Sequence, residues 1–389
     1  MQKLKFIYKA IKREILVITH DVNIILVILI APLFYAFFYS TVYINKVENK
    51  LPVAILDYDN SITSQKLITD LNAHQMINIV EKPLDYETGK KLLEKNDVQC
   101  LIIITKGFES DIKQMKGTKV KVYLNTTRFL VSNDINKAVT EVILEKAIEY
   151  RKEFFKNQGY SIEQSEQLVD PVRLDMRPLY NTTESYGDFI LPGLLALIIH
   201  QTLLIGLAES VAKEREEKTL KELFVTAGNR PLIALLGKIA FYFFLFAAYS
   251  FFFYTVNFKL FSLNLNGNMT LLAFITFLYI LAVLFLSVFI ASFFERKIIS
   301  LQVFAFTSIP LFLISGYSYP MQAIPWGMQF ISNLLPSTAY LTAQVRLTQM
   351  SASFTEILPE IIKLSIFVVV GFLAASYRFY RIYNDQKTN

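Results

Sequence analysis

The sequence predicts a polytopic α-helical membrane protein with six transmembrane helices and an inserted α/β extracytoplasmic domain. The 389-residue chain is 53% hydrophobic, and its mean hydropathy of +0.38 is too high for a soluble protein of this length. Six apolar stretches each reach the roughly 20 residues needed to cross a hydrocarbon core about 30 Å thick. Between the first two stretches lies a long segment in which strand and helix patterns alternate.

The six predicted spans are residues 22–43, 189–208, 232–256, 269–293, 298–316 and 359–377. The last five form a predicted transmembrane domain over 189–377. Lys and Arg accumulate on the cytoplasmic side of membrane proteins. Here they precede the first span and follow the second, fourth and sixth, whereas the short outer connections hold little beyond Lys259 and Arg346. We therefore expect both termini in the cytoplasm, with 378–389 as a cytoplasmic tail.

The first 21 residues predict an amphipathic helix. Apolar residues such as Leu4, Ile11 and Ile18 recur at helical spacing opposite several lysines, which is typical of a helix lying on the inner leaflet. A helix packed against other protein fits the pattern equally well. The first span is too long for a signal peptide, so we expect it to remain as an anchor.

Residues 45–185 are predicted to form the extracytoplasmic α/β domain. Predicted strands at 51–59, 76–81, 98–105 and 120–125 are separated by helical patterns, which favours parallel pairing, and a long helix follows at 131–158. Cys100 lies in a β-like apolar run and is expected simply to pack. Asp57 and Asp59 end a strand, where Asp is favoured for turn formation, so they indicate a turn rather than a metal site.

A charged segment, 209–230, separates the second and third spans and is predicted to be a cytoplasmic helix. Leu220, Leu223 and Phe224 fall at i, i+3 and i+4 and form an apolar stripe suited to a partner's groove. An ordinary charged loop is the simpler alternative. Lys238, in the third span, is expected to reach water at the inner face.

Prolines interrupt the chain from the fifth span onwards. The apolar segment after this span is too short to cross the membrane, which predicts a re-entrant or interfacial outer segment over 317–340. A plain proline-rich loop is the alternative. In the second span, His200, Gln201 and Thr202 form a polar patch that could line a pathway or bond to neighbouring helices.

The run KEREEKTLKELFVT, with Gly237-Lys238 downstream, resembles the cytoplasmic segment of type-2 ABC exporter permeases. It departs from that family at Lys218, where many members carry Gly. The phrases VAILDYDNSITSQKLITDL and LIIITKGFESDIKQMKGTKVKVYLN resemble the subset with a large insert after the first span. The order of Gly, Pro, Pro-Trp and Pro-Ser-Thr-Ala-Tyr in 316–350 is similar to the family's C-terminal signature.

The resemblance implies that the segment 209–230 docks on a separate ATPase and that the C-terminal signature caps the outer mouth of a pathway. The expected docking residues are Glu214, Arg215, Glu216, Thr219, Leu220, Leu223 and Phe224. The expected pathway or outer-gate residues are His200, Gln201, Thr202, Pro310, Gly316, Pro320, Pro325, Trp326 and Pro336.

The sequence indicates no enzyme activity in this chain. It has no Walker phosphate loop, no His or Cys spacing typical of a metal site, and no carboxylate near the middle of a predicted span for an ion relay. We therefore expect no cofactor here, with ATP and Mg held by a separate nucleotide-binding ATPase subunit. The implied complex is a homodimer or a pair with a paralogous permease in the prokaryotic plasma (inner) membrane, in contact with lipid but not nucleic acid, and it could include a periplasmic adaptor.

Two alternatives stay open. One is a membrane-anchored surface protein of the phage-receptor or secretion-accessory type, in which the external domain is the functional part. The other is a membrane-embedded enzyme, which is disfavoured because the spans carry no acid, base or metal set.

Overall fold

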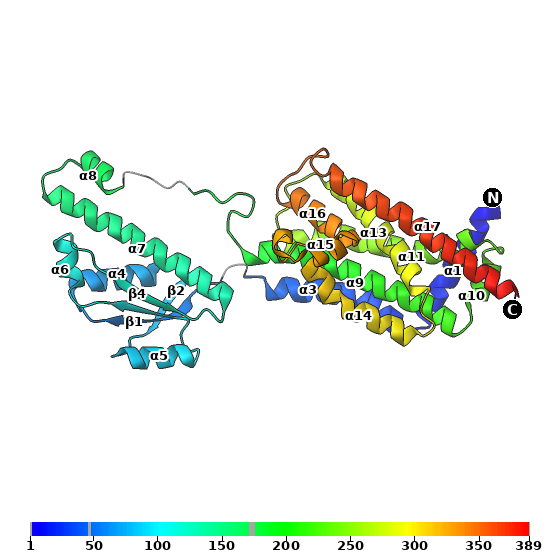
Figure 1. Cartoon of the computed structure of the whole chain (residues 1–389), viewed down its shortest axis with the longest axis horizontal. Helices are drawn as coiled ribbons and strands as arrows, with labels where there is room; N and C mark the ends of the chain where they lie inside the picture. Colours follow the sequence, from blue (N-terminus) through cyan, green and yellow to red (C-terminus); the bar gives the residue numbers. More distant parts are fainter. Residues whose placement is uncertain (1, 46–47, 171–175, 389) are drawn as a thin grey trace. The chain divides into compact units, whose positions relative to one another are not determined.

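The computed structural model describes residues 2–45, 48–170 and 176–388. The chain forms two compact units (Figure 1). One is Val47–Arg177, and the other combines Met1–Lys46 with Pro178–Asn389. We refer to them as the α/β unit and the helical unit.

Helices make up the helical unit. In chain order they are α1 Gln2–Thr19, α2 Val22–Ile25, the π-helix η1 Leu26–Ile30, α3 Ala31–Val42, α9 Tyr186–Glu216, α10 Leu220–Thr226, α11 Pro231–Phe252, the π-helix η2 Phe253–Asn257, α12 Phe258–Leu260, α13 Met269–Ala291, α14 Lys297–Ile314, the 3₁₀ turn η3 Met321–Ala323, α15 Trp326–Asn333, α16 Pro336–Thr348 and α17 Leu358–Thr388.

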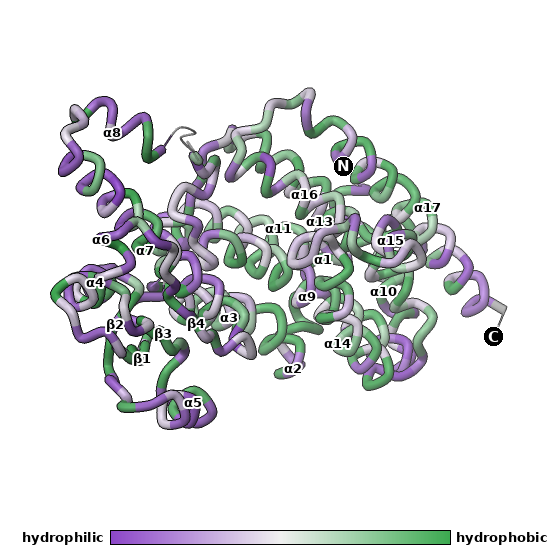
Figure 2. Tube along the Cα trace, turned by 60° about the vertical axis from the view of Figure 1, so that its left-hand side comes forward, coloured by the Kyte–Doolittle hydropathy of each residue, from purple (hydrophilic) through white to green (hydrophobic). Residues whose placement is uncertain are grey.

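Within the residues that the structure describes, six helical segments are long and apolar enough to span a membrane. They are Val22–Val42, Tyr186–Glu216, Pro231–Leu260, Met269–Ala291, Lys297–Ile314 and Leu358–Lys387. They coincide with the six predicted spans, so the prediction of a polytopic helical membrane protein is confirmed. Figure 2 shows hydrophobic residues along these helices and hydrophilic residues in the last turns of α17.

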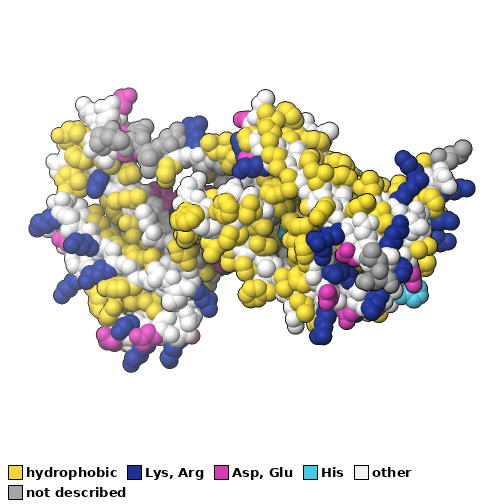
Figure 3. Space-filling model, turned by 45° about the vertical axis from the view of Figure 1, so that its right-hand side comes forward, with side chains coloured by type: hydrophobic (Ala, Val, Ile, Leu, Met, Phe, Trp, Pro, Cys, Tyr) yellow, Lys and Arg dark blue, Asp and Glu magenta, His cyan; other side chains and the backbone are white. Residues whose placement is uncertain are grey.

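Helix α9 lies at the centre of the helical unit. Of its most apolar stretch 78% is buried, against 17% for α14 and for α17. It packs against α3, α11, α13, α14 and α16. At Gly206 a Cβ atom would lie 2.1 Å from Cγ2 of Ile28 in η1, so the glycine permits this close packing. The peripheral helices leave hydrophobic side chains exposed (Figure 3), as a lipid-facing surface requires.

Helix α1 packs on protein with one face. Ala10, Glu14 and Ile18, spaced four residues apart, are buried, and α1 lies against α11. On the other side Leu4 and Tyr8 are exposed. The structure therefore shows the protein-packed alternative for one face, and the exposed face keeps the amphipathic character expected of a membrane surface.

The predicted single helix over 209–230 is wrong in its boundaries. Helix α9 continues through Glu216 and ends in a Schellman motif, in which the N–H of Thr219 bonds to the carbonyl of Glu214 and that of Lys218 to the carbonyl of Arg215. Lys218 has φ +58°, the left-handed conformation for which glycine is preferred at this position. This turn separates α9 from α10.

The C-terminal part of the helical unit has more helices than the sequence predicts. The segment 317–340 holds η3, α15 and the start of α16. The predicted tail from residue 378 is helical, because α17 continues to Thr388.

The α/β unit contains one four-stranded sheet in the order β2-β1-β3-β4. Its elements are β1 Leu51–Asp57, α4 Ile62–Ala73, β2 Ile77–Glu81, α5 Tyr86–Glu94, β3 Cys100–Ile104, α6 Phe108–Lys113, β4 Val120–Leu124, α7 Phe129–Asn157 and α8 Ile162–Val169. Strand β1 pairs in parallel with β2 and β3, as predicted, but β4 runs antiparallel to β3. The helix between β3 and β4, α6, has only six residues and rises about 9 Å, so it is shorter than the helices α4 and α5 of the two connections between parallel strands.

Both faces of the sheet are covered. Helices α4, α6 and α7 lie on one face and α5 on the other (Figure 1). Val53, Ile102 and Cys100 belong to the first core, and Ala54 and Leu101 to the second. The buried positions of α7 all lie in its first half, so the second half extends past the sheet and contacts α8.

Candidate functional site

A buried charge cluster joins three helices of the helical unit. The ammonium group of Lys238 in α11 is fully buried. It donates to both carboxylate oxygens of Glu14 in α1, at 3.0 and 2.9 Å, to Ser210 Oγ in α9 at 2.9 Å, and to Glu214 Oε2 in α9 at 2.7 Å. The expectation that Lys238 reaches water is therefore wrong, because two carboxylates and a hydroxyl surround it.

Arg13 completes the cluster. It pairs with Glu214 and donates to the carbonyl oxygen of Thr219 at 3.0 Å. Two cations and two carboxylates thus balance in charge, which is the condition under which buried ion pairs are tolerated. We call Arg13, Glu14, Ser210, Glu214 and Lys238 the charge cluster.

A glycine brings α1 close enough to α11 for this contact. A Cβ at Gly237 would lie 2.3 Å from the Cβ of Ala10, so the two helices approach there with only the Ala10 methyl group between them. Glu14 follows Ala10 by one helical turn and therefore faces the same neighbour. The Gly237-Lys238 pair thus provides both the close approach and the cation.

The apolar stripe of α10 faces inward. Leu220, Leu223 and Phe224 have exposed fractions of 1%, 0% and 2%. The ring of Phe224 meets Phe379 and Tyr383 of α17, with centroids 6.0 and 5.3 Å away. The prediction that this stripe is free to enter a partner's groove is therefore wrong, because the same apolar side chains pack against α1, α11 and α17.

The other predicted docking residues also make contacts within the chain. Arg215 bonds to the carbonyl oxygens of Ser292 and Phe294. Glu216 accepts from the backbone N–H of Lys297 at 2.8 Å, at the start of α14. Glu216 is nevertheless exposed, and the exposed surface of this segment also includes Glu217, Lys218, Lys221, Glu222, Val225, Asn229 and Arg230.

A second polar site interrupts the backbone hydrogen bonds of α9 near its start. Pro192 lacks an N–H, so the carbonyl of Asp188 loses its helical donor. The side chain of Gln349 supplies one instead, at 3.1 Å. Gln344 donates to the carbonyl oxygen of Pro192 at 2.9 Å.

The hydroxyl of Tyr317 replaces the next backbone hydrogen bond of α9. The hydroxyl accepts from the N–H of Gly193 at 3.0 Å and donates to the carbonyl oxygen of Phe189. These two backbone groups would otherwise bond to each other, because they are four residues apart. A Cβ at Gly193 would lie only 2.3 Å from the Tyr317 ring. We call Pro192, Gly193, Tyr317, Gln344 and Gln349 the α9 break.

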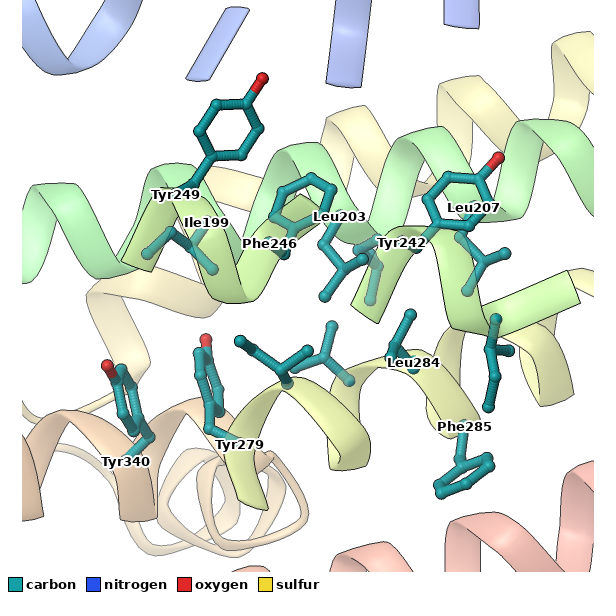
Figure 4. Close-up of a cluster of buried hydrophobic side chains, with 14 of the residues drawn as sticks. Ile199, Leu203, Leu207, Tyr242, Phe246, Tyr249, Tyr279, Leu284, Phe285 and Tyr340 are labelled. Carbon is teal, nitrogen blue, oxygen red and sulfur yellow. The ribbon is translucent and has the colours of Figure 1, made fainter. Parts of the chain in front are cut away.

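Stacked tyrosines lie next along this core. The rings of Tyr279 and Tyr340 are parallel, with centroids 3.9 Å apart (Figure 4). The Tyr340 hydroxyl lies 2.6 Å from that of Tyr254 and 3.0 Å from Thr276 Oγ1. His200 of α9 stacks on Tyr279 at 5.9 Å. The hydroxyl groups of Tyr254, Thr276 and Tyr340 therefore link η2, α13 and α16 next to α9.

The rest of the predicted polar patch bonds to helices. Gln201 donates to the carbonyl oxygen of Phe304 in α14 at 2.7 Å, and Thr202 donates to that of Ile198 at 2.6 Å within α9. These contacts are the helix-bonding alternative left open by the sequence.

The structure distributes the predicted outer residues over several elements. Gly316, with φ +80°, turns the chain so that Tyr317 reaches α9. Pro336 is buried at the first position of α16. Pro310 lies inside α14, whereas Pro320 and Pro325 directly precede the short helices η3 and α15. Trp326 is 83% exposed. Among these residues, only Gly316 is directly linked to the α9 break.

Sequence reasoning missed Glu14, Ser210, Tyr317, Gln344 and Gln349. One signal was available for Glu14, which is an acid on the apolar face of an otherwise basic helix. For Tyr317, the signals were the preceding glycine and the proline within the second span. Nothing local in the sequence points to the two glutamines.

These features define a polytopic membrane protein whose central helix carries a polar break at one end and a buried charge cluster at the other. The family model described as ABC-2 family transporter protein matches residues 23–377, and the chain therefore belongs to this family. It is a permease, and members of the family are transmembrane subunits of ABC transporters rather than ATPases. No curated protein matches the chain.

Proposed function

We propose that this chain is the permease subunit of an ATP-driven exporter and that a separate ATPase subunit drives it. The observation that supports coupling is the continuity of α9. The helix runs from the α9 break to the charge cluster, and the latter ties it to α1 and α11. A force applied to the surface after Glu216 would therefore be transmitted along one helix to the break.

The contact with the ATPase is proposed to use the exposed surface of α10 and the turn before it. Glu217, Lys218 and Lys221 provide charges of both signs, and Val225 provides an apolar side chain that is 64% exposed. The buried stripe has a supporting role, because it holds α10 on α1 and α17.

The α9 break is proposed as part of the outward path. Its polar groups lie within a predicted span, where backbone groups without helical partners are tolerated only in protein or beside water. Three side chains from outside α9 supply those partners. A movement of α9 that exchanges the Tyr317 hydroxyl for the helix's own bond between the Gly193 N–H and the Phe189 carbonyl would open or close the path at little cost in hydrogen bonds.

The proposed topology places both termini and α10 in the cytoplasm and the α/β unit outside, as an extracytoplasmic α/β domain of a prokaryotic plasma membrane protein. Basic flanks of the spans support this orientation. The complex would contain two permease chains, identical or paralogous, and two ATPase subunits. The α/β unit would guide cargo or meet a periplasmic adaptor.

Cysteine labelling tests the orientation. In intact cells, Lys156→Cys in α7 is expected to react with a membrane-impermeant thiol reagent, and Glu217→Cys only after lysis, because both side chains are exposed but on opposite sides. Native Cys100 serves as an internal control: it is fully buried, and burial raises the pKa of its thiol to about 12. Reaction of Glu217→Cys from outside would contradict the topology and the ATPase contact.

A charge at Val225 tests the docking surface. Val225→Asp is expected to weaken retention of the ATPase at least tenfold, because a carboxylate would enter the contact unpaired. Purified complexes are compared for bound ATPase. Leu84→Asp, at a position 91% exposed in the α/β unit, is the matched control and should retain it. Leu223 is unsuitable because it is buried within the chain.

Equal ATPase recovery with Val225→Asp, Leu84→Asp and wild type would contradict docking at α10. If no ATPase accompanies even the wild-type chain, the surface-protein alternative is favoured instead.

A further inference from the structure

The α/β unit has a pocket of about 450 Å³ where β1 and β3 end. It is lined by Tyr58, Tyr86, Ile103, Thr105, Lys106, Lys121 and Tyr123. Strands β1 and β3 are parallel neighbours, and their connections lead to opposite edges of the sheet, since β1 continues to β2 and β3 to β4. In open α/β sheets, ligands bind at the carboxyl ends of such strands. The volume falls in the usual range for small-ligand sites, roughly 300–1,000 Å³.

The pocket combines aromatic rings with cations. Tyr86 and Tyr123 have ring centroids 5.3 Å apart and planes inclined at 54°, and Tyr58 is 46% exposed. Lys106 and Lys121 are exposed, and within the described ranges neither takes part in an ion pair. Two like charges with no ion-pair partner among the described residues favour an anionic ligand. The rings offer flat surfaces for the apolar faces of that ligand.

The anion is not held in the manner typical of nucleotide sites. In those sites phosphate lies against the backbone N–H groups at a helix start. Here the chain's own carboxylates take these positions. Asp57 accepts from the N–H of Asn60 at 3.1 Å, in the turn before α4, and from Ser64 Oγ at 2.6 Å, in the first turn of α4. Asp59 accepts from the N–H groups of Gly107 and Glu109 at 2.7 and 3.0 Å, at the start of α6.

Both aspartates therefore have a structural role. Burial raises the pKa of Asp59, but hydrogen bonds from Ser61 and from the backbone N–H groups of α6 outweigh that effect and lower the pKa. A phosphate entering here would meet two carboxylates. The lysines on the α5 side remain as the cations available to an anionic group.

We propose that this pocket binds an acidic carbohydrate. Its sugar rings would stack on Tyr58 and Tyr123, and a carboxylate would pair with Lys106 and Lys121. Charge-assisted hydrogen bonds from the two ammonium groups would distinguish the acidic sugar from a neutral one. This inference concerns the α/β unit alone and holds whether or not α10 binds an ATPase.

Calorimetry on the full chain in detergent tests the proposal, with trigalacturonic acid as the probe. We expect it to bind, maltotriose to bind at least tenfold more weakly, and the affinity for the acid to fall as salt is raised. Lys106→Gln and Lys121→Gln should each weaken binding about fivefold to tenfold, and Tyr123→Ala about tenfold. Lys156→Gln, an exposed lysine on α7 across the sheet, is the matched control and should leave binding unchanged.

Thermal unfolding of the lysine variants should match the wild type, since these side chains are exposed. Equal affinity for maltotriose would overturn the charge argument. Tighter binding of AMP, with the same dependence on the two lysines, would make the pocket a nucleotide site. No binding of trigalacturonic acid at millimolar concentration would overturn the proposal.

Discussion

Lys238→Met is expected to destabilise the helical unit by about 3–5 kcal/mol, the usual cost of removing one partner from a buried ion pair. Methionine nearly fills the volume of lysine, so the loss arises from charge rather than from a cavity. Without the ammonium group, the buried carboxylates of Glu14 and Glu214 would face each other with only Arg13 to balance them. Thermal or denaturant unfolding of the purified chain in detergent measures the change.

Two further variants sharpen this test. Lys259→Met, at an exposed lysine of α12, should change the unfolding free energy by less than about 0.5 kcal/mol. Adding Glu14→Gln to Lys238→Met removes the surplus negative charge and should recover about 1–2 kcal/mol. If Lys238→Met is no more harmful than Lys259→Met, the cluster does not hold α1 to α9 and α11.

In the proposed mechanism, transmission of the ATPase's movement to the α9 break depends on the charge cluster. If the proposed contact at α10 is correct, Lys238→Met should leave ATPase binding at Val225 in place but reduce export. The variant would separate binding from transmission, because the docking surface and the charge cluster use different side chains.

The spans could be predicted from the sequence because hydropathy acts over some 20 residues and needs no knowledge of neighbours. The four strands were found for a similar reason, since their apolar runs are bounded by turns. The antiparallel pairing of β4 was missed because it depends on how far the six residues of α6 carry the chain.

The partner against which a helix face packs was harder to predict. Leu223 and Phe224 were correctly recognised as an apolar face, but the sequence does not say whether a partner or the same chain covers it. Here α17 does, about 150 residues further along the chain. Lys238 illustrates the same difficulty, because its acidic partners lie 224 and 24 residues away.

Lys218 shows where a departure from a family pattern carried structural information. Many members are expected to have Gly at this position, and the structure shows the left-handed conformation that glycine favours. The departure therefore marks a residue under modest strain in the turn between α9 and α10, without changing the turn itself.

Gly193→Ala is expected to destabilise the helical unit by about 2–3 kcal/mol, because the added methyl group would overlap the Tyr317 ring. The ring would have to move away, and its hydroxyl would then lose the N–H at residue 193 and the carbonyl of Phe189. Gly327→Ala is the matched control. It adds the same methyl group within α15, where nothing lies within 4 Å, and should be neutral or slightly stabilising.

A double-mutant cycle shows whether the clash is the cause. Tyr317→Ala alone should cost about 3 kcal/mol, since it empties a buried site and removes the hydroxyl. Combined with Gly193→Ala, it should cost clearly less than the sum of the two single changes, with a coupling energy of at least about 1 kcal/mol. Unfolding free energies measured in detergent give the cycle. Strict additivity would mean that Tyr317 does not occupy the position beside Gly193, and the α9 break would then lose its central contact.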